Sequence, residues 1–215
     1  MTTATAAAHL SPAARNTVLR VAWLSVLLGL GLEIVLLAVA AASSKVPSGG
    51  MIVADTVQKL SWSVFVCVGL VLGVAAASQR SALLPGVAGM LAAPLAFVVA
   101  RALHKGVVQA LALAPNAGGG PSPLTLALLK GLEYGTLGLL LGGVVQRSRR
   151  GFAAYALAGF VTGLVFGGIA LVLMQPLPPA VFAARAVNEI LFPVGCALVA
   201  GAARAFGSST PQELS

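Results

Sequence analysis

Acidic residues are scarce in this chain. Its 215 residues include five Asp and Glu, and charged residues of both signs together make up 8% of it. A soluble globular domain carries about 25% charged residues, so this composition excludes an ordinary water-soluble fold. Glu33, Glu133 and Glu189 lie within long apolar segments. A carboxylate placed there costs at least about 2.5–3.5 kcal/mol on membrane-insertion scales, which makes each one a candidate functional residue.

Residues that commonly carry catalysis are also few. Intramembrane aspartyl chemistry needs two aspartates, and Asp55 is the only aspartate in the chain. A transmembrane haem protein needs buried histidines as axial ligands, but His9 lies in the predicted tail and His104 is alone near a predicted interface. Cys67 and Cys196 are not spaced as a metal-binding pair, so we expect buried, unreactive thiols. No Gly-x-Ser-x-Gly, His-Glu-x-x-His or Walker motif is present. We therefore expect no enzymatic activity, no cofactor and no bound metal.

Long apolar runs are abundant. Hydrophobic residues make up 59% of the chain, and the mean hydropathy is +1.00. Runs of about 18 or more such residues can cross a bilayer core of about 30 Å. The pattern predicts an all-α, polytopic transmembrane bundle with six helices near 19–42, 54–78, 84–106, 123–146, 151–174 and 181–203. It assigns 1–18 and 206–215 to cytoplasmic tails around one transmembrane domain, 19–205.

Local signals refine the predicted helices. Ser122 followed by Pro123 is typical of a helix N-cap with proline in the first turn. Pro94 and Pro193 lie inside predicted spans, where each removes a backbone hydrogen bond. Pro193 would free a carbonyl close to Glu189, one way to build an ion site. Trp23 and Trp62 are expected in the aromatic belts at the two membrane surfaces.

The distribution of basic residues predicts the orientation. Lys45 is almost alone on one side of the six-span arrangement, and the loop arginines gather on the other side. The positive-inside rule then places both termini in the cytoplasm and the protein in the plasma membrane. The formal charge of +8 follows from this excess, without the interleaved basic face that nucleic-acid binding requires. The arginines concerned are Arg15, Arg20, Arg80, Arg147, Arg149, Arg150 and Arg204.

The six spans form three consecutive hairpins with a weak internal resemblance. Each even-numbered span opens with a basic residue, Lys59, Lys130 or Arg185, and carries a polar group three or four residues later. Internal repeats are common in transporters, with the binding site at the repeat interface. The alternative is that six-helix proteins in general place basic residues at helix ends.

Glycine patterns predict close helix packing. Small residues drive helix association in lipid, because apolar side chains gain little there by leaving the lipid. Gly69 and Gly73 form one such pair, and the fourth span holds Gly131–Gly135 and Gly138–Gly142. Glu133 lies about 160° from Gly131 around the same helix, so we expect a central fourth helix buried on two faces. Glycine faces could also bind partner membrane proteins or a second copy of the chain, besides lipid.

Depth along the helices brings the charged residues together. At 1.5 Å per residue, Glu33 lies about 20 Å from the cytoplasmic edge, and Glu133 and Glu189 lie about 13–15 Å from the outer edge. We expect ion pairs within one helix, Lys130–Glu133 and Arg185–Glu189. The first candidate ligands are Glu33, Lys130, Glu133, Arg185, Asn188 and Glu189. The second are Asp55, Lys59, Arg101, His104 and Lys105, of which the last three are expected at the outer interface or, if turned inward, as countercharges for Glu33.

Two functions fit these residues. In the first, the chain transports or binds a small solute or ion at a polar cluster that opens outward, with carboxylates that hold a cation or relay protons, or bases that hold an anionic group. In the second, the chain is a non-catalytic subunit that scaffolds or anchors a membrane complex, and the charges are self-neutralising pairs that lock helices together.

Overall fold

The described residues fold into six long helices. The structure is a computed structural model that describes residues 12–77, 83–114, 121–147 and 151–207, and this part of the chain contains no strand. Every helix is long and apolar enough to cross a membrane, so the chain is a multi-pass membrane protein whose outer helix faces contact lipid. The helices are α1 (Pro12–Ala42), α2 (Gly49–Ala77), α3 (Leu84–Ala110), α4 (Pro123–Gln146), α5 (Phe152–Leu173) and α6 (Pro179–Gly207).

Helix boundaries follow the local signals. The Ser122 hydroxyl accepts a hydrogen bond from the Thr125 N–H at 3.1 Å and Pro123 begins α4, which confirms the predicted cap. Helix α1 begins at Pro12, so it extends into the segment that the sequence assigned to the N-terminal tail. Helices α3 and α6 continue through Pro94 and Pro193. The remaining tail residues, 1–11 and 208–215, lie outside the described part.

The C-terminal ends of α1 and α3 are built alike. Ser44 and Ala112 have positive φ angles of 55° and 49°. The N–H of the next residue turns back onto the helix, from Lys45 to the Ala40 carbonyl at 2.9 Å and from Leu113 to the Val108 carbonyl at 3.0 Å. This Schellman arrangement satisfies carbonyls that a helix end leaves without partners.

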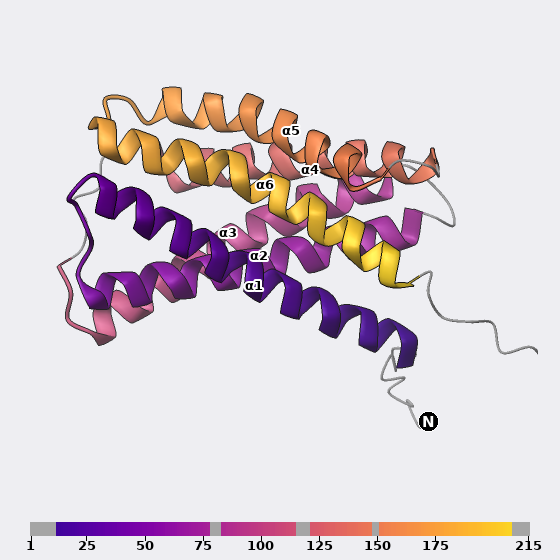
Figure 1. Ribbon diagram of the computed structural model, residues 1–215, viewed down its shortest axis with the longest axis horizontal. Coiled ribbons are helices and arrows are strands. Elements are labelled where there is room, and N and C mark those ends of the chain that lie inside the picture. Colours follow the sequence, from indigo (N-terminus) through magenta and orange to yellow (C-terminus); the bar gives the residue numbers. More distant parts are fainter. Residues whose placement is uncertain (1–11, 78–82, 115–120, 148–150, 208–215) are drawn as a thin grey trace, which may run out of the picture.

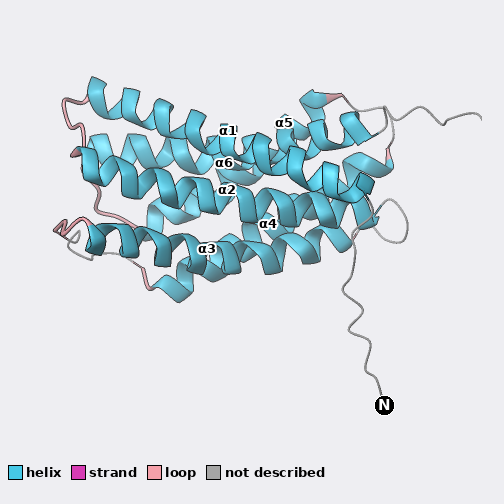
Figure 2. Ribbon diagram, turned by 90° about the horizontal axis from the view of Figure 1, so that it is seen from below, coloured by secondary structure: helices cyan, strands magenta, loops and turns pink. Residues whose placement is uncertain are grey.

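The helices form an inner and an outer set. They lie along one long axis, and the loops gather at the two ends (Figures 1 and 2). Helices α2, α4 and α6 contact one another, and each of α1, α3 and α5 contacts the two inner helices beside it. The described parts of α1, α3 and α5 make no such contacts with each other. The predicted central position of α4 is therefore confirmed, and α2 and α6 share it.

Glycines allow the closest helix contacts. Gly73 of α2 packs on Pro85 and Ala88 of α3, and Gly138 of α4 packs on the Pro85 backbone. On the other side of the bundle, the glycine stripe of α5 lies against α6, with Gly159 on the Pro193 backbone. These glycines join helices of the same chain, as predicted, because a Cβ at such positions would overlap the neighbouring backbone.

Aromatic rings and thiols fill the centre of the bundle. Trp62 makes edge-to-face contacts with Phe97, Tyr134 and Phe192, at centroid distances of 6.4, 5.6 and 6.3 Å. The expected interfacial position of Trp62 is therefore wrong, because the indole packs inside the bundle where three helices supply aromatic partners. Trp23 is exposed on α1, compatible with contact to lipid.

The two cysteines meet in the core. Cys67 of α2 and Cys196 of α6 are fully buried, and their sulfur atoms are 3.2 Å apart. Burial was predicted from the sequence, but the contact between them depends on the packing of α2 against α6.

Substitution of glycine by alanine should be more destabilising where the neighbouring helix leaves less space for the new methyl group. In Gly138→Ala the new Cβ would overlap the Pro85 carbonyl, whereas in Gly143→Ala on the same helix it would meet nothing within 4 Å. We expect Gly138→Ala to lower stability by about 1–3 kcal/mol and Gly143→Ala to be neutral. Thermal unfolding of the two purified variants measures this, and equal midpoints would contradict the α3–α4 packing.

The cysteine contact gives a direct test of the helix arrangement. Mild oxidation in membranes should join Cys67 to Cys196 in a disulfide, because small movements bring adjacent sulfurs into bonding distance. Mass spectrometry of digested protein should find the two peptides linked, and Cys67→Ser should abolish the link. Failure to form any intramolecular link would show that α2 and α6 do not meet at this level.

Candidate functional site

Three buried carboxylates occupy one level of the bundle. Glu33 lies nine residues before the end of α1. Glu133 and Glu189 each lie ten residues after the start of their helix, α4 and α6 respectively. At 1.5 Å per residue, each lies about 14–15 Å from the same end of the bundle, close to half the thickness of a bilayer core. The predicted grouping in depth is thus reproduced by the helix bounds.

Lys130 joins two of these carboxylates. Its Nζ donates to Glu133 Oε2 at 2.7 Å and also contacts Glu189 Oε2 on the neighbouring helix. The Glu133 side chain is 1% exposed, Glu189 9% and Lys130 15%. We call Lys130, Glu133 and Glu189 the α4–α6 cluster. The contact from Lys130 to Glu133 within α4 confirms a predicted pair, and the contact across to α6 was not predicted.

The predicted pair between Arg185 and Glu189 is wrong. Arg185 is exposed, and its Nη1 donates to the Met174 sulfur at 3.3 Å. Glu189 instead turns to Lys130 of α4, because a buried carboxylate is best stabilised by a buried ammonium group. Asn188 beside it is half-buried.

A second ion pair joins α1 and α2. Lys59 Nζ lies 2.5 Å from Glu33 Oε2, and both side chains are largely buried. The two atoms are close but are not aligned as a hydrogen bond, since that oxygen has no hydrogen-bond partner. Glu33 therefore takes its countercharge from α2, and the alternative partners on α3 are not used.

The basic segment of α3 reaches α2 by a different contact. His104 Nε2 lies 3.1 Å from Asp55 Oδ1, with both side chains partly exposed. The Arg101 guanidinium carbon is 6.0 Å from the Phe97 ring centroid, within reach of a weak cation–π contact. Lys105 is exposed. Asp55, Lys59 and His104, which were secondary candidates, thus all take part in contacts between helices.

The α4–α6 cluster carries unequal charges. The pair Glu33–Lys59 balances one carboxylate with one ammonium, but Lys130 is shared by two carboxylates. Glu133 Oε1 is buried and has no hydrogen-bond partner. Buried polar groups nearly always have a partner, so this oxygen requires an explanation. Glu33 Oε2, the other such atom among the described residues, lies 2.5 Å from the Lys59 ammonium group.

The carbonyl freed by Pro193 is covered by protein. Proline at this position leaves the Glu189 carbonyl without a helical N–H. Gly163 of α5 packs directly against that carbonyl, and Gly167 packs against the Glu189 side chain. The interruption therefore supports close packing of α5 on α6 and does not add an oxygen to the cluster.

Sequence reasoning missed the cross-helix partners and one neighbour. Tyr134 is fully buried beside Glu133 and touches Trp62. Its position between Glu133 and Gly135, both expected on buried faces of the helix, was the signal that could have predicted its burial. In the described part of the chain, no three His, Cys, Asp or Glu side chains come together as a metal site.

Comparisons with known proteins found no match that assigns a role to these residues. No protein-family model, curated protein or solved structure matches this chain.

Removal of Lys130 should be costly. Lys130→Met leaves two buried carboxylates without a countercharge, and we expect a loss of about 3–5 kcal/mol in stability. The control is Arg185→Met, which changes an exposed base near the start of α6, as Lys130 lies near the start of α4. It should alter stability by about 0.5 kcal/mol or less. Unfolding in detergent measures both, and similar losses would contradict the shared role of Lys130.

Proposed function

We propose that this chain is a plasma-membrane protein that binds a small solute or ion at the α4–α6 cluster and moves it across the bilayer. The observation that carries the proposal is the burial of three charged side chains near half-depth of the bundle. Charges inside a membrane are expensive and commonly mark substrate or ion pathways. A site between inner helices is also the usual place for a ligand in helical bundles.

Polar and apolar groups divide the centre of the bundle along its axis. The charges lie toward the end where α4 and α6 begin. Toward the other end, the centre is filled by fully buried apolar side chains, among them Val66, Leu70, Leu137 and Leu141. We infer an outward-opening site that is closed on the cytoplasmic side by this apolar packing.

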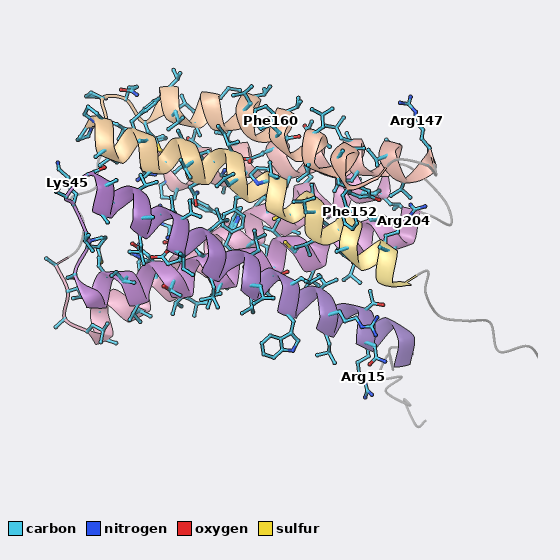
Figure 3. All side chains as sticks on the ribbon, viewed as in Figure 1. Arg15, Lys45, Arg147, Phe152, Phe160 and Arg204 are labelled. Carbon is cyan, nitrogen blue, oxygen red and sulfur yellow. The ribbon has the colours of Figure 1, made fainter. Side chains whose placement is uncertain are left out.

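The proposed orientation rests on the basic residues. Arg15, Arg147 and Arg204 lie at the end of the bundle opposite to Lys45 (Figure 3). By the positive-inside rule, the arginine end faces the cytoplasm, together with both termini. Arg80, Arg149 and Arg150, which belong to the same prediction, lie outside the described residues.

We also infer that the chain consists of three hairpins, α1–α2, α3–α4 and α5–α6. Each would contribute one inner and one outer helix, in keeping with the helix contacts. The α4–α6 cluster would then lie between the second and third hairpins, as binding sites do in transporters built from repeats.

Labelling tests the orientation. In a chain that lacks both native cysteines, Ser48→Cys should react with an impermeant maleimide from outside intact cells, and Gly151→Cys should react after permeabilisation alone. Both positions flank helices at opposite ends of the bundle. Reaction of both from outside, or the reverse pattern, would contradict the proposed topology.

Neutralisation of the whole cluster tests the function. Because Lys130 bonds two carboxylates, a neutral variant needs three changes, Lys130→Met, Glu133→Gln and Glu189→Gln. We expect this variant to fold and to lose the flux that the unaltered protein shows in proteoliposomes probed with pH dye, ²²Na⁺, ⁸⁶Rb⁺ and ³⁶Cl⁻.

The matched control removes the balanced pair by Glu33→Gln and Lys59→Met. It changes a similarly buried ion pair between two other helices, so it should keep most of the flux. Full activity in the triple variant would reduce the α4–α6 cluster to a structural contact.

The second candidate function is a non-catalytic subunit of a membrane complex. It is favoured by an apolar groove of about 360 Å³ on the α3–α4 seam, lined by Leu83, Gly86, Val87, Met90, Leu132, Gly135, Thr136 and Leu139. A transmembrane helix of a partner would fit such a surface. Purification from native membranes distinguishes the two functions, because a stoichiometric partner would favour the subunit.

A further inference from the structure

The α4–α6 cluster has one negative charge more than its own bases compensate. Lys130 supplies one positive charge, and Glu133 and Glu189 supply two carboxylates. In a medium of low dielectric constant, an uncompensated charge is strongly unfavourable. The cluster therefore requires one further positive charge when the protein is in the membrane.

The charged groups on the neighbouring helices make contacts outside the cluster or are exposed. On α3, the Arg101 guanidinium lies 6.0 Å from the Phe97 ring centroid, and Lys105 is exposed. On α2, Lys59 pairs with Glu33 and Asp55 contacts His104 of α3. On α6, Arg185 contacts Met174 at the exposed side of the helix. Helix α5 meets Glu189 through Gly163 and Gly167, and α3 meets the Lys130 turn of α4 through Met90 and Pro94.

The uncharged titratable groups near Glu133 do not supply this charge. Tyr134 of α4 follows Glu133 in the chain and is fully buried, as are Cys67 of α2 and Cys196 of α6, whose sulfur atoms are 3.2 Å apart. A phenol or thiol can only become negative when it loses its proton. These groups cannot balance a carboxylate.

Glu133 Oε1 marks where the missing charge belongs. Its side chain is 1% exposed, and this oxygen has no hydrogen-bond partner. We propose that Glu133 Oε1 holds one exchangeable proton, so that the α4–α6 cluster is the proton site of this protein. This inference rests on the proposed function and names its ligand.

A proton fits the site better than an alkali cation. An alkali ion would lie next to the Lys130 ammonium, which repels it, and the described residues bring no third acidic, His or Cys ligand to the cluster. A proton needs no coordination shell. On release, the O–H bond of Glu133 breaks, the electron pair stays on the carboxylate and the proton passes to water, with no other bond changed.

Infrared spectroscopy of the purified full chain in nanodiscs tests the site. At neutral pH the unaltered protein should show the C=O stretch of a protonated carboxylic acid, equivalent to one group per chain. Glu133→Gln should remove this band. Glu33→Gln should retain it, because Glu33 belongs to the balanced pair.

Several results would overturn the proton site. They are absence of the band in the unaltered protein, its persistence in Glu133→Gln, or its loss when Na⁺ or K⁺ is added at constant pH. Glu133→Gln keeps the Lys130–Glu189 pair, so we expect it to fold. A check without any variant is ¹³C labelling of the glutamate carboxyls, which must shift the band; an unshifted band would also overturn the assignment.

Flux measurements separate this inference from the proposed function. Proton entry into proteoliposomes loaded with pyranine reports movement, whereas the infrared band reports occupancy without any gradient. A band without flux of any probe would retain the proton site and reject transport. Flux without the band would retain transport and reject the proton site.

Discussion

The arrangement of this bundle depends on the cost of a carboxylate inside a membrane. Lipid offers no hydrogen bonds or countercharges, so a buried carboxylate must find them within the protein. Glu33 finds Lys59 on the next helix, and Glu189 finds Lys130 across the bundle. Each of these pairs joins two helices whose relative rotation must bring a specific acid to a specific base. Breaking such a pair is costly, which gives the pairs a role in specifying one arrangement.

Glycine packing makes these ion pairs possible. The lysine and glutamate of different helices reach each other only if the helix axes are close, and glycine permits the closest approach. Helix α4 uses both devices at once. Gly138 lies on the Pro85 backbone of α3, while Glu133 faces the interior on another side of the helix. The helix is therefore held by van der Waals contact on one face and by charge on another.

The division of the inner helices into a charged half and an apolar half links this packing to the proposed function. Around Cys67, Leu70, Leu137 and Cys196 the centre is closed by side chains that are fully buried. At the level of Glu133 it holds polar groups whose needs are not all met within the protein, as the oxygen without a partner shows. A buried polar atom that lacks a hydrogen-bond partner within the protein is a place where a bound ligand or proton would satisfy an unmet need.

The sequence alone determined the number and type of the helices, because apolar runs long enough to span a bilayer admit few other structures. It also determined that Glu33, Glu133 and Glu189 are buried at a similar depth, since the rise per residue fixes depth along a helix. The Lys130–Glu133 pair followed from its spacing on one helix. Partners on different helices did not follow: the sequence placed Arg185 with Glu189 and Trp62 at an interface, and both predictions were wrong. Only the tertiary structure decided those contacts, because the rotation and neighbours of each helix depend on how all six pack together, which no local pattern encodes.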